Sequence, residues 1–169
     1  MRLWGALLVI AGAVMLGVCA VRQLKQREKD LQELIAGLEV IHRELGSRLM
    51  PIPELLKQAA EETTGEAAVF FRLCAEKITC MGGKSFCSVW KENLNVSHLH
   101  LELVDRETVE RLGSVLGRYD EEMQCRSIEK AINRLEALYQ QAMESSAQLG
   151  KVYTVLGLTG GVLLVICFI

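Results

Sequence analysis

The chain has 169 residues, which is enough for one domain with accessory segments but too few for two full cores. Hydrophobic residues make up 50% of the chain and charged residues 24%; 19 Lys and Arg stand against 21 Asp and Glu, so the formal net charge is −2. This mildly acidic balance gives no electrostatic reason to expect nucleic acid as a partner. Aromatic residues are only 5% of the chain and proline occurs twice. This composition favours helices over sheets and predicts an all-α protein.

The first predicted element is an uncharged apolar run at residues 3–21. As a helix it would be about 28 Å long, which matches the hydrocarbon core of a bilayer. The alternatives are a cleaved signal peptide and a lipoprotein acceptor at Cys19. An uncleaved membrane anchor is favoured for two reasons. The run is longer than the apolar core of a usual signal peptide, and the four cations that follow it favour a cytoplasmic location for that side. We expect these cations to meet lipid headgroups; they are Arg22, Lys25, Arg27 and Lys29.

The helix predicted at residues 3–21 continues past the apolar run, because no breaker follows. Apolar residues recur at steps of three and four as far as Leu45, and Gly46 provides a stop. The apolar positions are Leu24, Leu31, Leu34, Ile35, Leu38, Ile41 and Leu45.

Four shorter helices are predicted between residues 53 and 116. Pro53 suits a first helical position, and Ser85 and Asp105 are expected to be N-caps. The stretch 93–103 is the least regular and is predicted to be a loop. The predicted helices cover residues 53–62, 66–80, 85–92 and 105–116.

The last predicted element is a helix of roughly 50 residues that begins after the N-cap Asp120 and runs to Ile169 without a proline. Its final 18 residues, 152–169, carry no charge and are expected to span a membrane, with Lys151 at the inner boundary. The alternative is a lipid-anchor signal that is removed on processing.

Both apolar runs contain small residues four positions apart, Ala13 and Gly17 in the first and Gly157 and Gly161 in the second. This spacing fits close helix packing in a hairpin or a homo-oligomer, and it also fits ordinary glycine in a membrane helix.

Three segments follow from these elements. We predict an N-terminal transmembrane helix (1–21), a cytoplasmic bundle of about six helices (22–151) and a C-terminal transmembrane helix (152–169). The predicted localisation is a membrane with two spans and the body in the cytoplasm.

No constellation in the sequence is typical of a catalytic or metal site. His98 and His100 have no partner at ligand spacing, the six cysteines form no C-x-x-C, and there is no phosphate-binding glycine loop. A small hydrolase is disfavoured because a nucleophile–base pair is missing. We therefore predict a non-enzymatic interaction module without cofactor or metal.

The order of the features resembles the stage III sporulation protein AB family of endospore-forming bacteria over essentially the whole chain. The matching segments are the basic run from Val21 to Lys29, Leu31 with Leu38-Glu39 and Glu44, Met50-Pro51-Ile52-Pro53-Glu54-Leu55, Leu116-Gly117 with Tyr119-Asp120 and Gln124, and the glycine-containing run 156–166.

This resemblance implies a body similar to the cytoplasmic helical domain of type II secretion and type IV pilus platform proteins. It implies a place in the channel complex that joins mother cell and forespore, in the outer forespore membrane. The implied partners are membrane lipid, the secretion-type ATPase encoded beside it and other membrane proteins of the complex.

Polar residues within the matching segments are the predicted partner contacts, with helix capping as the alternative role of Asp120 and Glu54. They are Glu39, Glu44, Glu54, Asp120 and Gln124. A membrane-anchored helical signalling adaptor is the second functional hypothesis.

Overall fold

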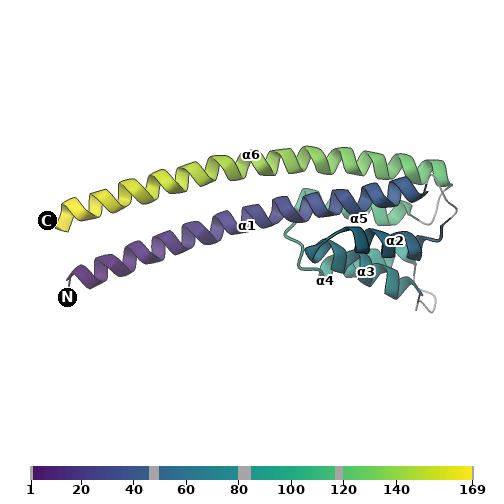
Figure 1. The fold of residues 1–169 in the computed structure, drawn as a ribbon, viewed down its shortest axis with the longest axis horizontal. Helices are drawn as coiled ribbons and strands as arrows, with labels where there is room; N and C mark the ends of the chain where they lie inside the picture. The colour runs from purple at the N-terminus through teal and green to yellow at the C-terminus, as the bar shows by residue number, and fades with distance from the viewer. Residues whose placement is uncertain (1, 46–49, 80–84, 117–119, 169) are drawn as a thin grey trace. The chain divides into compact units, whose positions relative to one another are not determined.

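The computed structural model describes residues 2–45, 50–79, 85–116 and 120–168, and it describes the side chains of all of these except 2–20, 121 and 150–168. These residues form six helices and no strand, so the all-α prediction is confirmed (Figure 1). In chain order the helices are α1 (Arg2–Leu45), α2 (Ile52–Glu62), α3 (Gly65–Thr79), α4 (Phe86–Val96), α5 (Leu103–Val115) and α6 (Glu121–Phe168).

The chain divides into two compact units. One unit comprises Arg27–Gln140 and therefore holds α2 to α5 together with the adjoining parts of the two long helices. The other comprises Met1–Gln26 and Gln141–Ile169, which contribute the remaining helical turns of α1 and α6. All side-chain contacts described below lie within the Arg27–Gln140 unit, called here the body.

The predicted localisation, in a membrane with two spans, is wrong. Where the structure describes side chains, no helix combines the length and the apolar character that crossing a membrane requires. In α1 the physical reason is charge, because residues 22–30 carry six charged side chains that are costly in hydrocarbon. The predicted spans at 3–21 and 152–169 fall almost wholly on side chains outside the described residues, as do Ala13, Gly17, Gly157 and Gly161.

The turn before α2 forms as the two prolines predict. Pro51 is the N-cap with extended backbone (φ −61°, ψ 143°), and its carbonyl accepts hydrogen bonds from the amides of Glu54 at 2.9 Å and Leu55 at 3.2 Å. Pro53 lies in the first turn, where its missing N–H costs no hydrogen bond.

Two boundaries differ from the prediction. Helix α4 is capped by the Ser85 hydroxyl as expected, at 3.3 Å from the Ser88 amide, but it runs on to Val96 because Asn93 and Leu94 are buried. Helix α5 begins after Glu102, and Asp105 lies in its first turn instead of at the N-cap. The Asp105 carboxylate reaches back to accept from the Glu102 backbone N–H at 2.9 Å, so it still caps the helix.

An aromatic cluster forms the centre of the body. Trp90 packs edge-on against Phe70, with ring centroids 4.8 Å apart, and Phe70 contacts Phe71 at 5.4 Å. The Trp90 indole N–H donates to the Val109 carbonyl at 2.8 Å, which joins α4 to α5. Each of these fully buried rings contributes about 2–3 kcal/mol by leaving water.

The predicted apolar stripe of α1 faces this core. Leu31, Leu34, Leu38 and Ile41 are at most 1% exposed. The first turns of α6 contribute a second stripe, in which Ile128 and Leu135 are completely buried, whereas Met123 is half exposed. The three- and four-residue steps read from the sequence therefore identify the buried faces of both long helices within the body.

Candidate partner-binding surfaces

Arg27 is the centre of a buried polar cluster between α1 and the start of α5. Its Nε and Nη2 donate to the two carboxylate oxygens of Asp105 at 2.8 and 3.0 Å, and its Nη1 donates to Glu102 Oε1 at 2.7 Å. The Asp105 side chain is completely buried, whereas that of Glu102 is 62% exposed. Such a planar, bidentate pair fixes both distance and orientation.

Asp30 extends the cluster one helical turn along α1. Its Oδ2 accepts from the backbone N–H of His100 at 2.8 Å and lies 3.0 Å from His100 Nδ1. Asp30 is almost completely buried and the His100 ring is about half exposed. Asp30 thus attaches the segment around His100 to α1, and Arg27 attaches Glu102 and the first turn of α5 to the same helix.

Electrostatics in the cluster favour the charged form of Arg27. The hydrogen bonds that Arg27 donates to Asp105 raise the pKa of the guanidinium, and this outweighs the opposing effect of its burial. Its hydrogen bonds join α1 to the start of α5. Among the described residues no group of three or more His, Cys, Asp or Glu side chains is placed to hold a metal ion.

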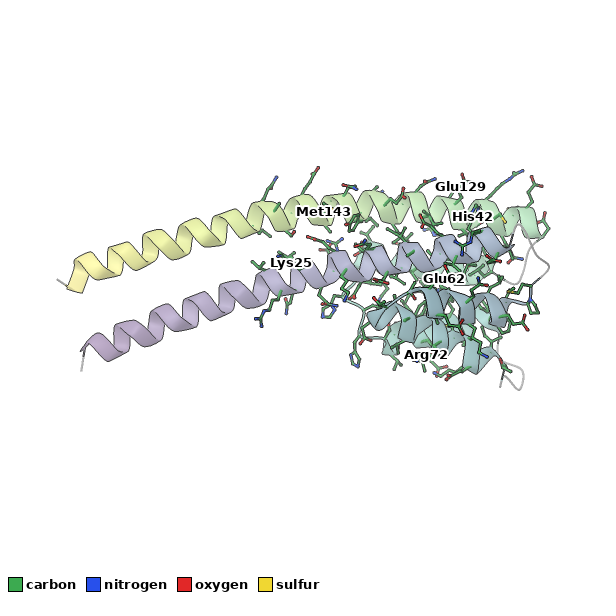
Figure 2. All side chains as sticks on the ribbon, in the orientation of Figure 1. Lys25, His42, Glu62, Arg72, Glu129 and Met143 are labelled. Atoms are coloured by element: carbon green, nitrogen blue, oxygen red, sulfur yellow. The ribbon has the colours of Figure 1, made fainter. Side chains whose placement is uncertain are left out.

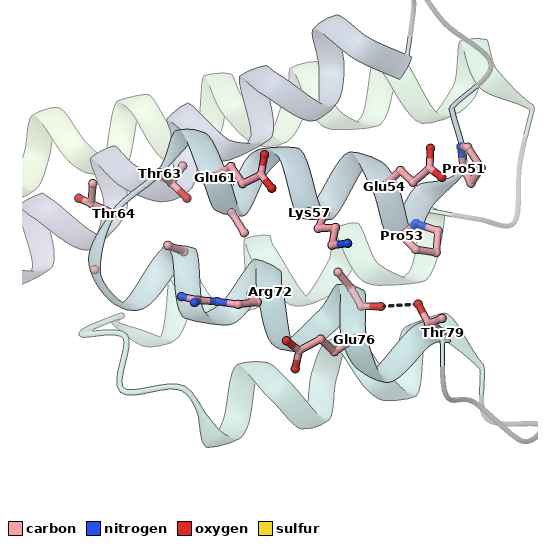
Figure 3. A pocket seen from close by; sticks show the side chains of 14 residues that line it. Pro51, Pro53, Glu54, Lys57, Glu61, Thr63, Thr64, Arg72, Glu76 and Thr79 are labelled. Carbon is pink, nitrogen blue, oxygen red and sulfur yellow. Dashed lines mark hydrogen bonds between the residues drawn. The ribbon is translucent and has the colours of Figure 1, made fainter.

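A long groove runs between α2 and α3 (Figure 3). Its volume is about 1100 Å³. Three alanines line it: Ala60 is half-buried, and Ala68 and Ala75 are buried. Its edges carry five exposed charged side chains, which are Glu54, Lys57 and Glu61 on α2 and Arg72 and Glu76 on α3.

The other side of the α2–α3 hairpin is already occupied. Arg43 of α1 donates to both carboxylate oxygens of Glu62 at 3.1 Å, and Glu33 of α1 accepts from the Thr64 N–H at 2.7 Å and from its hydroxyl at 2.9 Å. Helix α1 thus contacts the end of α2 and the turn after it, where Thr64 also lines one end of the groove.

The structure places the five predicted partner contacts at separate points. Glu54 is exposed and lines the groove, and Glu39 is exposed on α1. Glu44 is partly buried and accepts from Arg43 Nε at 3.2 Å. Asp120 is exposed just before α6, and its backbone carbonyl accepts a hydrogen bond from the backbone N–H of Gln124 at 3.1 Å. Gln124 is buried.

The predicted membrane-interface cations also differ in position. Lys25 is exposed on α1 (Figure 2), as are Arg22 and Lys29. Arg27, in contrast, is buried with Asp105, a position unlike that expected of a headgroup-facing side chain. The side chain of Lys151 lies outside the described residues.

Sequence reasoning missed the Arg27 cluster, although a signal was present. Arg27 precedes Leu31 by four positions, so it falls on the same stripe as Leu31, Leu34 and Leu38. A charged residue in register with a buried stripe indicates an internal partner, because an unpaired buried charge is too costly.

Comparisons with known proteins agree on one family. The family model described as stage III sporulation protein AB matches residues 2–169. The chain is 23% identical over 168 residues to the stage III sporulation protein AB of Bacillus subtilis (strain 168), covering 98% of both chains. A solved structure of a stage III sporulation protein AB shares the fold with a TM-score of 0.66 at 22% identity, covering 72% of this chain and 97% of the solved one.

Proposed function

Because the chain belongs to the stage III sporulation protein AB family, we propose that it is a scaffold, or platform, in the secretion-like channel complex between mother cell and forespore and is required for endospore development. The observation that carries this proposal is the family match over residues 2–169. The partners proposed for it are a secretion-type ATPase encoded beside it and other proteins of the channel complex.

The surfaces of the body support a scaffolding role. The α2–α3 hairpin contacts α1 through Arg43 and Glu33, and its groove of about 1100 Å³ with charged edges is open to another molecule. The Arg27–Asp105 pair ties α5 to the same helix. A body in which α1 contacts the α2–α3 hairpin and α5, and in which α4 is joined to α5 by the Trp90–Val109 hydrogen bond, can present several faces in constant geometry.

A deletion experiment tests the proposed role in development. Removing the gene in its own host is expected to abolish heat-resistant spores, with arrest during stage III, and re-expressing the full chain is expected to restore them. Normal numbers of heat-resistant spores in the deletion strain would overturn the proposal.

A capture experiment tests the proposed partners. The full chain, purified through a tag from sporulating cells, is expected to bring down the neighbouring ATPase and at least one further channel protein. An unrelated tagged protein from the same cells is the control. Capture of signalling proteins in place of both would instead favour the adaptor hypothesis.

A further inference from the structure

The groove between α2 and α3 has dimensions that suit a helix. Its two walls are helices of 11 and 15 residues, which correspond to about 16 and 22 Å of length. Its volume of about 1100 Å³ lies above the usual range of small-molecule pockets, roughly 300–1000 Å³. A third helix could therefore lie along it for three to four turns.

Small side chains line the groove where such a helix would pack. Ala68 and Ala75 are seven positions apart on α3, so they lie on one face, and Ala60 comes from α2. Helices pack with axes 8–10 Å apart depending on the side chains between them, and alanine permits the close end of that range.

The charges at the edges have a definite order. Glu54, Lys57 and Glu61 follow one another along α2, and Arg72 and Glu76 face them from α3 (Figure 3). Within the described residues none of these five takes part in an ion pair. Glu62, one position further on, is in contrast paired with Arg43. The edges thus present an acidic–basic–acidic row on α2, and three carboxylates against two cations in all.

We propose that this groove binds one α-helix of a protein partner, about 11 to 15 residues long, with small apolar side chains on the face that enters the groove. Charge complementarity specifies its flank: the side that faces α2 carries a basic–acidic–basic row at steps of three or four residues, opposite Glu54, Lys57 and Glu61. We take the partner to be another protein of the channel complex, and only this choice rests on the proposed scaffolding function.

Two synthetic peptides serve as probes. Each is a 15-residue peptide with an alanine stripe on one face, a fluorophore, and a hydrocarbon staple on the solvent side that stabilises the helix. One peptide carries a Lys-Glu-Lys row on its flank, and the other carries a Glu-Lys-Glu row. The row reads the same in both directions, so the probe works in either orientation. Fluorescence anisotropy with the full chain is expected to show about tenfold tighter binding of the Lys-Glu-Lys peptide. Its flank places opposite charges against the α2 edge of the groove, whereas the Glu-Lys-Glu flank places like charges there.

Two sets of variants locate the binding. Ala60→Trp fills the groove and is expected to remove binding, whereas Val69→Trp, at an exposed α3 position outside the groove, is expected to retain it. The triple variant Glu54→Lys, Lys57→Glu, Glu61→Lys is expected to reverse the preference of the two peptides. Glu129→Lys, Lys130→Glu, Glu136→Lys is the matched control, because it makes the same net change of charge at exposed positions of α6, with the two glutamates also seven positions apart.

Several outcomes overturn the inference. Equal binding of both peptides, binding of neither, or no effect of Ala60→Trp would each do so, provided that circular dichroism shows the variant to be folded. A wild-type dimer that Ala60→Trp converts to a monomer in sedimentation would assign the groove to a second copy of the chain instead.

A sporulation assay separates this inference from the proposed function. With the function correct, Ala60→Trp on the chromosome is expected to lower the yield of heat-resistant spores at unchanged protein level, and Val69→Trp is not. If deletion of the gene blocks sporulation while Ala60→Trp has no effect, the groove inference alone fails. If deletion has no effect, the proposed function fails and the peptide measurements still decide what the groove binds.

Discussion

Arg27 and Asp105, which are 78 positions apart in the sequence, form a two-point ion pair inside the body. Two guanidinium nitrogens of Arg27 donate to the two oxygens of Asp105, at 2.8 and 3.0 Å, and the Asp105 side chain is completely buried. The net contribution of a buried ion pair to stability is small, but removing one partner is strongly destabilising, because it leaves an uncompensated charge buried. The position of α5 on α1 therefore depends on this contact.

We predict that Arg27→Ala lowers the free energy of unfolding by about 3–5 kcal/mol, because Asp105 keeps its burial and loses its counter-charge. Urea unfolding of the full chain, followed by circular dichroism, measures this change. Adding Asp105→Asn to Arg27→Ala is expected to recover part of the loss, because the amide oxygen can still accept from the Glu102 N–H without a charge.

Arg43→Ala is the matched control, because it removes an arginine of the same helix from an exposed pair with Glu62. Exposed ion pairs contribute little, so only a small change in stability is expected. A loss for Arg27→Ala no larger than that for Arg43→Ala would contradict the role assigned to the buried pair.

The positions of the helices could be predicted from the sequence wherever local chemistry decides them. The prolines at 51 and 53 and the Ser85 cap act within three or four residues of their own position, and the structure has both boundaries close to where they were expected. The end of α4 could not be predicted in the same way. Asn93 has a loop-forming side chain, yet it is buried and lies 3.6 Å from Cys74 Sγ, a tertiary contact that no local pattern contains.

The candidate site was less accessible to sequence reasoning. The family-like segment points to Glu54, and Glu54 does line the groove, but two of the three alanines and the opposite edge come from α3. Which residues of two helices meet depends on how the helices pack, which the periodicity of each helix alone does not specify. Arg27 belongs to the cluster of cations that follows the apolar run, which predicts a place at the lipid interface; its register with the Leu31 stripe, in contrast, indicates the buried position that it has.

We predict that the carboxyl group of Glu62 titrates below its ordinary range. The hydrogen bonds from Arg43, followed by that from Gln58, lower its pKa, because they favour the ionised form. A group with a lowered pKa in the folded state contributes stability above its unfolded pKa and loses that contribution as the pH falls through the folded pKa. The contact of α2 with α1 is thus expected to weaken in acid.

Carbon NMR of the Glu62 carboxyl in the full chain measures this titration. Arg43→Ala is expected to move the midpoint upward, toward the ordinary value. Arg111→Ala removes a guanidinium that pairs with Glu107 instead, and it is expected to leave the midpoint unchanged. An unchanged midpoint in Arg43→Ala would refute the assignment.

We predict that Cys74 is the least reactive of the described cysteines. Burial raises the pKa of its thiol to about 12, and the contact with Asn93 opposes this only in part. Since the thiolate is the reactive form, alkylation at pH 8 is expected to modify the half-buried Cys87 and Cys125 first and Cys74 only when the protein unfolds. Timed alkylation with peptide mass spectrometry, with and without urea, measures the rates; similar rates for Cys74 and Cys87 without urea would contradict the prediction.

Gly37 lies where α1 passes close to the Phe71 ring. A Cβ atom at this position would lie 2.2 Å from Phe71 Cε2 and 2.7 Å from Cζ, and the Phe71 ring is completely buried, so it has little room to move. Alanine would gain up to about 1 kcal/mol of helix propensity over glycine, whereas overpacking a core costs about 1–3 kcal/mol or more. We predict that Gly37→Ala is destabilising despite its better propensity.

Denaturation of a double-mutant cycle tests this explanation. Phe71→Leu removes ring atoms beside Gly37, so Gly37→Ala is expected to cost less in that background than in the wild type. Gln32→Ala, at an exposed position of the same helix, is the control and should change the stability by no more than about 0.5 kcal/mol. If Gly37→Ala stabilised the protein in both backgrounds, helix propensity would outweigh packing here, and α1 would not need glycine to approach Phe71.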